Sequence, residues 1–488
     1  MTQINVDTTP ADPLQLHPED LPDIQGFIVH GYNMPKSRHF VITIGQIGAA
    51  LEFLDALTSG SGRLLITSAA RWPGGVKPEY ALNIGLSATG LQALKLPSSV
   101  SINQGNFSSF LAGAVAAAKT VGDTGPNDPA YWVTKLNTAN ANIAHVLLSL
   151  YTNTSGDRDF YSNILREMFA PVIPPPGSPG SDVFEWDVDP IVDVDPVTGE
   201  KFRKIHFGYT DGISNPIIDA VDLPPLRPNQ LPYVPAWQFV TRDGSMTSYN
   251  LPTPLQFGQN GTFSAFRILD QNVPAFEAFL KADRRDETAQ EYLAGKLCGR
   301  WRNGNPVVLE PEAPGPMLPD NELMDFDYGT DNVGQPCPYS SHTRRTNSRG
   351  GPLVVPVGDQ IDHRIMRRAD AYGPRYEGVD DDYERGLAGH FMCVMFSNQF
   401  EFVMSQWVNS TTFPGAPAQA GIDPLLGNVP AGSTFTYWES DKPVVVKGLS
   451  RFVTTRGGLY LFIPSITAIK WMAQNGNASN PWTVPAVA

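Results

Sequence analysis

The 488-residue sequence has few cysteines, no long apolar run and no excess of positive charge, and each absence removes a class of protein. The three cysteines, Cys298, Cys337 and Cys393, are odd in number and far apart, which excludes a disulfide framework and paired-cysteine metal sites and predicts buried thiols. No run of about 18 apolar residues occurs, so no membrane partner is expected. The net charge of -14 argues against nucleic acid as a partner, because no basic block is present to contact phosphates.

The N-terminal residues 1–23 are polar and rich in proline, and they carry no apolar signal core. This composition predicts that residues 1–23 form a polar N-terminal lead outside the folded domains. The chain as written is therefore expected to be soluble. A secreted protein whose signal has already been removed is the expected location, with the cytoplasm as the alternative.

The length predicts two domains or one duplicated unit, because one hydrophobic core rarely supports a chain of this size. Strand-like segments at 38–44 and 262–269 each precede an amphipathic helix, at 47–57 and 273–282, which hints at internal duplication. Strands and helices mix without a strict alternation, so the expected fold class is α+β. Domains are expected at 24–222 and 223–488. Further predicted elements are strands at 80–86, 391–396 and 457–464, helices at 88–94, 140–151, 400–408 and 466–473, and an exposed connector at 171–195.

Histidines are few and unpaired. None of the eight has the spacing of a multi-histidine metal site, so zinc and non-haem iron centres are disfavoured. A haem iron needs a single histidine. His342 is the strongest candidate, because Arg344, Arg345 and Arg349 follow it and cationic side chains can neutralise the haem propionates. A surface histidine in a basic loop is the alternative for His342 taken alone.

Two other segments carry acid–base and cationic groups. Residues 206–216 read HFGYTDGISNP, where two glycines bracket Asp211 in a tight loop; a surface turn is the alternative for this loop alone. Residues 365–368 read IMRR, so Arg367 and Arg368 point to opposite sides if the segment is extended, and the inner one needs an anion. A carboxylate can move a proton between the oxygens of a peroxide while an arginine stabilises the developing charge.

Taken in order, these segments resemble the sequence blocks of the dye-decolorising peroxidases, a family of haem enzymes. The resemblance extends from residue 24 to the C-terminus, and the long proline-rich connectors suit the larger fungal members. Several blocks in register make the resemblance specific where any single block is weak. The blocks are GYTDGISNP at 208–216, HTRRTN at 342–347, IMRR at 365–368 with YG at 372–373, ERGL at 384–387, and GG at 457–458 with FIPS at 462–465.

The resemblance implies two ferredoxin-like α+β halves in tandem, of the dimeric α+β barrel type, with haem b bound mainly by the second half. It implies His342 as the axial ligand of the haem iron. It also implies Asp211 as the distal acid–base group and Arg367 as the distal cation that supports heterolysis and compound I. Arg344 and Arg349 are expected to contact the cofactor.

Bulky reductants such as dyes and lignin fragments are too large for a narrow haem pocket, and the resemblance implies electron transfer through surface aromatics. Trp407, beside polar neighbours on the predicted helix, is the first candidate and Tyr372 the second; a core position is the alternative for the tryptophan. An acidic cluster after Tyr372 suits oxygen-preferring Mn²⁺ as a substrate, and a solvated acidic loop is the alternative. The candidate Mn²⁺ ligands are Asp219, Glu377, Asp380, Asp381 and Asp382.

The sequence therefore predicts a haem peroxidase that uses hydrogen peroxide to oxidise bulky dyes and phenols, with Mn²⁺ as a further candidate substrate, and that is a monomer or homodimer. A chlorite dismutase-like or deferrochelatase-like protein on the same fold is the nearest alternative, and the pair of Asp211 and Arg367 favours the peroxidase. A haem-binding or transport protein and a haem-free extracellular binding module are alternatives from other classes. The hydrogen-bond partner of His342 stays open, with Glu401 among several acids.

Overall fold

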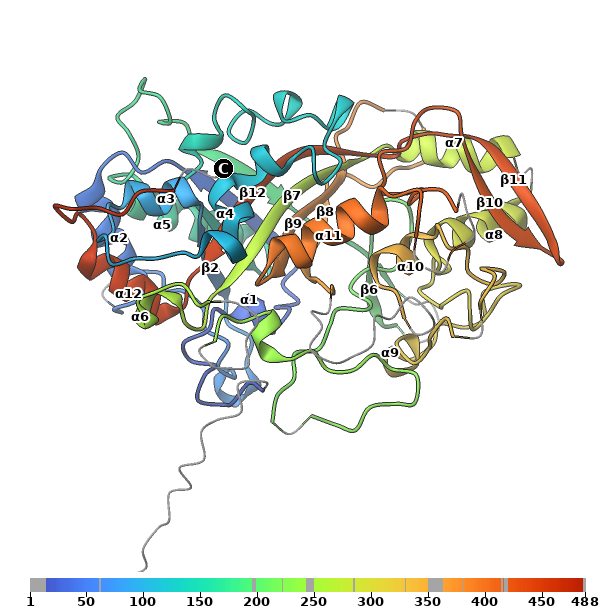
Figure 1. Cartoon of the computed structure of the whole chain (residues 1–488), viewed down its shortest axis with the longest axis horizontal. Helices are drawn as coiled ribbons and strands as arrows, with labels where there is room; N and C mark the ends of the chain where they lie inside the picture. Colours follow the sequence, from blue (N-terminus) through green and yellow to red (C-terminus); the bar gives the residue numbers. More distant parts are fainter. Residues whose placement is uncertain are drawn as a thin grey trace, which may run out of the picture.

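The computed structural model describes residues 15–60, 63–194, 199–221, 223–242, 250–283, 286–329, 331–349, 363–379, 381–413, 416 and 420–485. Within them, eight strands form one antiparallel sheet in the order β4-β1-β3-β2-β12-β7-β9-β8 (Figure 1). The sheet and the helices around it confirm the α+β fold class.

The sheet consists of two four-stranded halves with the same topology. Within each half the strands lie in the order fourth, first, third, second along the chain. The halves join where β2 pairs with β12, with Phe462 opposite Leu86. The repeated order is that of two ferredoxin-like units in tandem, as expected; the proposed domain boundaries stay a prediction. The N-terminal strands are β1 Lys36–Ile42, β2 Tyr80–Leu86, β3 Val146–Thr152 and β4 Phe184–Val188, and the C-terminal strands are β7 Thr262–Gln271, β8 Met366–Tyr372, β9 Gly386–Cys393 and β12 Val453–Ile463.

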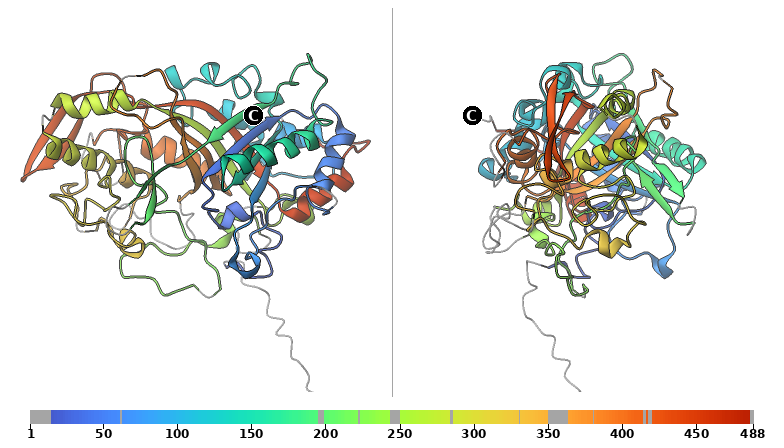
Figure 2. Two further views of the ribbon diagram at one scale, coloured as in Figure 1. Left: turned by 180° about the vertical axis from the view of Figure 1, so that it is seen from behind. Right: turned by 90° about the vertical axis from the view of Figure 1, so that its right-hand side faces the viewer.

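Helices cover the outer faces of the two halves. α5 lies across β1 and β3, where Phe169 packs against Phe40 (Figure 2). The last helix, α12, returns to the N-terminal half and packs on α2 (Figure 1). The longer helices are α2 Ile47–Ala56, α3 Ala88–Ala93, α4 Gln104–Ala117, α5 Ser155–Phe169, α7 Val273–Asp283, α8 Glu287–Cys298 and α12 Ile466–Asn475. The shorter ones are α1 Gly26–Val29, α6 Leu255–Gly258, α9 Asp320–Leu323, α10 His342–Thr346 and α11 Phe400–Phe402, which continues into a π-helical turn at Val403–Val408.

Two hairpins lie outside the main sheet. The first pairs β5 Ile191–Val194 with β6 Lys201–Lys204, and the second pairs β10 Ser433–Glu439 with β11 Lys442–Leu449. The second hairpin extends from one end of the molecule beside α7 and α8 (Figure 1). β6 matters for the site, because it leads directly into the loop that carries Asp211.

The two halves face each other through a buried chain of polar side chains. His390 of β9 lies 2.9 Å from Ser264 Oγ through Nδ1 and 2.9 Å from Ser149 Oγ through Nε2. Ser149 Oγ in turn lies 2.9 Å from Nδ1 of His39 on β1. Burial lowers the pKa of His39 to about 4 and that of His390 well below its ordinary value, so both rings are neutral near pH 7.

Two segments differ from their predicted structure. Residues 140–151 are predicted as a helix, which is wrong, because residues 146–152 form the central strand β3. Every residue of β3 is buried, and a short run that is apolar throughout does not distinguish a strand from a helix by its period. The predicted connector at 171–195 is also interrupted by β4, whose alternating sequence FEWDV pairs with β1.

Candidate active site

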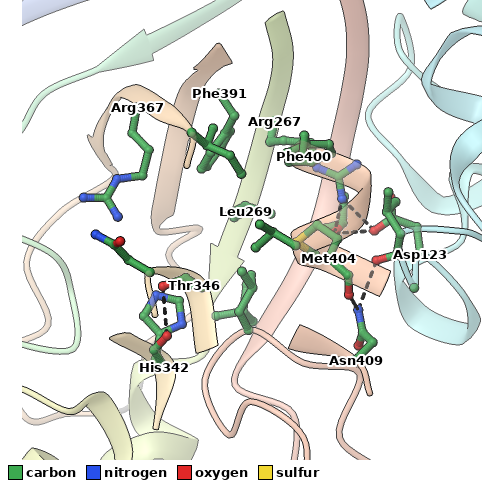
Figure 3. A pocket seen from close by; sticks show the side chains of 18 of the residues that line it. Asp123, Arg267, Leu269, His342, Thr346, Arg367, Phe391, Phe400, Met404 and Asn409 are labelled. Atoms are coloured by element: carbon green, nitrogen blue, oxygen red, sulfur yellow. Dashed lines mark hydrogen bonds and ion pairs between the residues drawn. The ribbon is translucent and has the colours of Figure 1, made fainter. Parts of the chain in front are cut away.

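A cavity lies on the outer face of the C-terminal half of the sheet. Leu269 of β7, Phe391 of β9 and Val453 of β12 line it from the sheet, and His342 of α10 lines the opposite wall. Arg367 of β8 also lines it, and Figure 3 shows Arg367 and His342 at the same end of the cavity. The site therefore combines an apolar floor formed by the sheet, a cation on the sheet strand β8, and a histidine on the wall opposite the sheet.

His342 is held by a buried carboxylate. Its Nδ1 lies 2.7 Å from Asp423 Oδ2, the geometry of a ring N–H that donates to a carboxylate. Asp423 is fully buried, and its Oδ1 accepts hydrogen bonds from the backbone N–H groups of Leu425 and Leu426. This arrangement fixes the ring tautomer and leaves Nε2 as the nitrogen that can bind a metal.

Glu401, one of the several acids left open for this role, lies elsewhere. Its Oε2 accepts from Ser109 Oγ at 2.8 Å and its Oε1 from the hydroxyl of Tyr460 at 3.1 Å. Asp423, and not Glu401, is therefore the partner of His342. The reason is that α11 directs this side chain towards α4 and β12, while the chain that carries Asp423 passes under α10.

Arg345 fastens the short helix that carries His342. Its guanidinium donates to the backbone oxygens of Tyr339, Trp407 and Ser410 at 2.6 to 2.9 Å. Burial lowers the pKa of Arg345 to about 10, and Asp423 partly opposes this effect. Arg345 thus ties α10 to the segment that precedes it, at Tyr339, and to residues 407–410. The position of His342 is therefore set by the surrounding structure and not by α10 alone.

The Asp211 loop lines the same cavity on the side away from His342. Gly208 and Gly212 have φ of +90° and +82°, a conformation that favours glycine, so the two glycines set the path of the loop. The backbone N–H of Asp211 donates to the carbonyl oxygen of Arg203 at 2.9 Å, and Asp211 Oδ1 accepts from Gly212 N at 2.7 Å. Asp211 and Arg367 line the same part of the cavity.

Arg367 is bound by this loop but not neutralised by it. Its Nη2 donates to Ile213 O at 2.7 Å, and its backbone N–H donates to Asn215 Oδ1 at 3.0 Å. Among the described residues no carboxylate forms an ion pair with Arg367. The guanidinium is therefore available to an anion that forms in the cavity.

Two buried arginines converge on Ser214, which also lines the cavity. Arg300 Nη2 lies 2.7 Å and Arg349 Nη2 lies 3.2 Å from Ser214 Oγ. Burial lowers the pKa of Arg300 to about 10 and that of Arg349 to about 9, and no carboxylate in the described part of the chain pairs with either. Arg349 Nε also has no hydrogen-bond partner there. Two buried cations without a counter-charge fit an anionic ligand group such as a carboxylate.

Arg344, expected to contact the cofactor, is not brought to the cavity. Its Nη1 forms an ion pair with Asp331 at 2.8 Å and bonds the carbonyl oxygen of Cys337 at 2.6 Å. Its guanidinium also lies over the rings of Tyr328 and Tyr339. These partners occupy the side chain, and we therefore assign Arg344 to holding residues 331–339 in place.

Trp407 and Tyr372, expected at the surface, are buried, with 8% and 4% of their surface exposed. The surface expectation is wrong because each packs into an aromatic group. Trp407 contacts the rings of His363 and Phe402, and Tyr372 contacts the ring of Trp186 at 5.0 Å.

The acidic residues named for Mn²⁺ do not form a cluster where the structure describes them. In the described ranges no group of three or more His, Cys, Asp or Glu side chains is placed to hold a metal ion. Both oxygens of Asp381 accept from Arg385 Nη2, and Asp219 Oδ1 accepts from Gln15. Asp380 lies outside the described residues, and Glu377 and Asp382 are exposed.

Sequence reasoning missed Asp423, Arg300 and Ser214 as site residues. Ser214 belongs to the loop at 206–216, but its sequence context does not distinguish it from an ordinary turn residue. Asp423 is 81 positions from His342, and no local pattern connects the two. Such partners are recognised only when the fold brings them together.

Comparisons with known proteins find peroxidases that are similar to this chain over most of its length. No protein-family model matches the chain. Peroxidase 2 of Mycetinis scorodonius is 29% identical, with 92% of this chain and 87% of the relative covered, and the dye-decolorizing peroxidase AauDyP1 of Auricularia auricula-judae is 28% identical, with 92% and 86% covered. A solved structure of a dye-decolorizing peroxidase in complex with 2,6-dimethoxyphenol is 26% identical, with a TM-score of 0.74 over 93% of this chain and 99% of that chain.

Proposed function

The chain belongs to the dye-decolorizing peroxidase family, and we propose that it oxidises dyes and phenols with hydrogen peroxide at a haem b bound between His342 and Arg367. One observation carries the proposal. A single cavity has a histidine supported by a carboxylate on one wall and, on the other, a carboxylate beside an arginine that has no acidic partner among the described residues. These are the groups that peroxide cleavage requires.

The residues present fit a haem. His342 Nε2 would bind the iron, Leu269, Phe391 and Val453 would contact the apolar ring, and the pair of Arg300 and Arg349 would neutralise the propionates. When bound, haem supplies the iron at which peroxide is cleaved and the oxidising equivalents that are later passed to the reductant.

Three side chains perform the acid–base and electrostatic work. Asp211 takes the proton from one oxygen of hydrogen peroxide and returns it to the oxygen that leaves. Arg367 stabilises the negative charge that develops on the leaving oxygen. Asp423 keeps Nδ1 of His342 protonated and makes Nε2 a stronger donor to a metal.

For reductants too large for the cavity, we propose electron transfer through aromatic side chains. Tyr372 lies at the end of β8 and contacts the partly exposed Trp186, which offers a route outwards. Trp407 with Phe402 and the stacked ring of His363 offers a second route. Replacing Tyr372 or Trp407 with Phe separates the two: the variant on the true route loses turnover of a bulky dye and keeps turnover of a small phenol, whereas unchanged dye turnover in both excludes them.

Secretion, lignin fragments as reductants and oxidation of Mn²⁺ belong to the same proposal. Large dyes and lignin fragments are extracellular compounds, which supports a secreted enzyme. Mn²⁺ has the weakest support, because the described acidic residues form no metal-binding group. Addition of Mn²⁺ and peroxide to the purified enzyme, with a chelator that reports Mn³⁺, tests this substrate directly.

The decisive test compares the wild type with Asp211→Asn in stopped-flow absorption after mixing with one equivalent of hydrogen peroxide at acidic pH. The wild type should show a rapid change of the Soret band, and the variant should be slower by about 10²- to 10⁴-fold. Asp189→Asn, at a carboxylate that pairs with Arg158 and does not line this cavity, serves as the control and should match the wild type. A Soret band that ignores peroxide would indicate a haem carrier, and the absence of a Soret band would exclude haem chemistry.

A further inference from the structure

A second cavity, of about 240 Å³, lies on the other side of the Asp211 loop. Exposed residues, among them Gly31, Asn33 and Gly212, line it, so it reaches the surface. Asp211 and Arg367 line it as well as the haem cavity. The volume is sufficient for several water molecules. The two cavities therefore meet at the proposed acid–base group.

Asp370 faces this second cavity. It lies three positions after Arg367 on β8, so the two side chains leave the strand on opposite faces. Its side chain is only 14% exposed, and Arg203 Nη1 lies 2.6 Å from both of its oxygens. The backbone oxygen of the same Arg203 accepts the N–H of Asp211 at 2.9 Å. Arg203 of β6 thus holds both Asp370, through its side chain, and Asp211, through its backbone.

The surroundings raise the pKa of Asp370 into a range where its carboxyl can take up and release a proton under mildly acidic conditions. Burial raises the pKa of Asp370 to about 6; Arg203 opposes this effect, and the charge of Asp211 adds to it. The buried side chain of Tyr151 also lines this cavity. The charged and titratable groups that line the cavity with Asp370 are Arg203, Arg367, Arg368, Asp211, Tyr32 and Tyr151.

Peroxidase turnover creates a demand for protons at Asp211. Reduction of hydrogen peroxide to two water molecules takes up two protons and two electrons. A bulky reductant that stays outside delivers electrons through the protein and releases its protons to solvent. The protons must then reach the haem cavity by another path, and the second cavity joins the surface to Asp211.

We propose that Asp370, positioned by Arg203, is a proton-delivery residue for Asp211. The inference rests on the proposed peroxidase function. In each transfer the O–H bond of the Asp370 carboxyl breaks, a water molecule in the cavity accepts that proton and gives another to the Asp211 carboxylate, and Asp370 is protonated again from solvent. No electrons move in this step. Asp370 touches neither peroxide nor haem, so it is a positioning and relay residue and not a catalytic one.

The test measures two steps separately in wild type and Asp370→Asn: the reaction of the enzyme with peroxide, and the subsequent reduction of the oxidised enzyme by ferrocyanide. The reaction with peroxide should be unchanged within about twofold, because peroxide brings its own proton to Asp211. Reduction by ferrocyanide, which brings no proton, should slow by about 10-fold or more and lose its dependence on pH around 6. Asp370→Glu, which keeps the carboxyl, should restore much of the rate. Equal rates and pH profiles for Asp370→Asn and wild type would overturn the inference.

A matched control and a measurement without turnover complete the design. Asp189→Asn removes a carboxylate that also lies 2.6 Å from an arginine, Arg158, and should behave as wild type. In haem-free protein, infrared titration should show a protonated carboxyl that ionises near pH 6 in wild type and Asp189→Asn but not in Asp370→Asn. If Asp370→Asn does not fold, a ferrocyanide rate in wild type that is flat between about pH 5 and pH 7 overturns the inference. A wild type that ignores peroxide would instead show that the peroxidase function itself is wrong.

Discussion

The two halves of the sheet repeat one strand order but use their outer faces differently. In the N-terminal half, α5 lies directly on the strands, and Phe169 packs against Phe40. In the C-terminal half, the face that carries Leu269 and Phe391 borders a cavity. The same topology therefore supports a closed hydrophobic layer in one half and a cavity in the other.

One source of the difference is the connection between the first and second strands of each half. In the N-terminal half, this connection covers residues 43–79 and contains α2. In the C-terminal half it covers residues 272–365 and contains α7, α8 and α10, so it brings His342 to the cavity. A long connection placed over the sheet can thus create a cavity without a change in the order of the strands.

The largest effect is expected from His342→Ala, which removes the only proposed iron ligand from the C-terminal half. The variant should fold with the same far-ultraviolet circular dichroism, because α10 is held by Arg345, but it should lose the Soret band of the wild type. Added imidazole should restore part of that band by replacing the missing ring. A five-coordinate haem spectrum identical to that of wild type would show that another residue is the ligand.

Asp423→Asn weakens the hydrogen bond that supports His342 without removing the proposed iron ligand itself. The amide cannot keep Nδ1 of His342 polarised as a carboxylate does, so the reduction potential of the bound haem should rise and peroxide turnover should fall by about 10- to 100-fold. The measurement is a redox titration combined with stopped-flow kinetics. Glu401→Gln is the control, since Glu401 bonds Ser109 and Tyr460 instead. A potential equal to that of wild type would exclude Asp423 from this role.

Arg349→Ala and Arg344→Ala test which arginine holds the propionates. Arg349 has no carboxylate partner in the described residues, so its loss should weaken haem affinity by about 10-fold, the effect of one charge-assisted hydrogen bond. Arg344 pairs with Asp331, so its loss should lower the melting temperature more than it lowers haem affinity. Haem transfer to apomyoglobin measures the affinities. A larger loss of affinity in Arg344→Ala would reverse the assignment.

The sequence predicted the parts of the fold and site that have a local signal. The strands β1, β2, β7 and β12 and the helices with an apolar stripe are predicted, although β2 and β7 are buried almost throughout, and the Asp211 loop, His342 and Arg367 line one cavity. β3 is missed because a short run that is apolar throughout does not by its period distinguish a strand from a helix. Asp423 and Arg300 were missed because their partners are distant in sequence and lie close only in the folded chain.

The smallest effect concerns the contact between the halves, the buried chain that contains His39 and His390. The pKa of His39 in the folded protein, about 4, is lower than its ordinary value of 6.5, so the unfolded chain binds a proton that the folded chain does not as pH falls between these values. The contribution of this histidine to stability is therefore lost on acidification, by about 1 kcal/mol for each pH unit in this window. His39→Asn keeps a polar atom near Ser149 and should reduce the loss of stability between about pH 6.5 and pH 5.5 by that amount, while haem binding at neutral pH stays unchanged. Urea unfolding at both pH values measures the effect, and an equal loss in wild type and variant would show that His39 does not stay neutral in the folded protein.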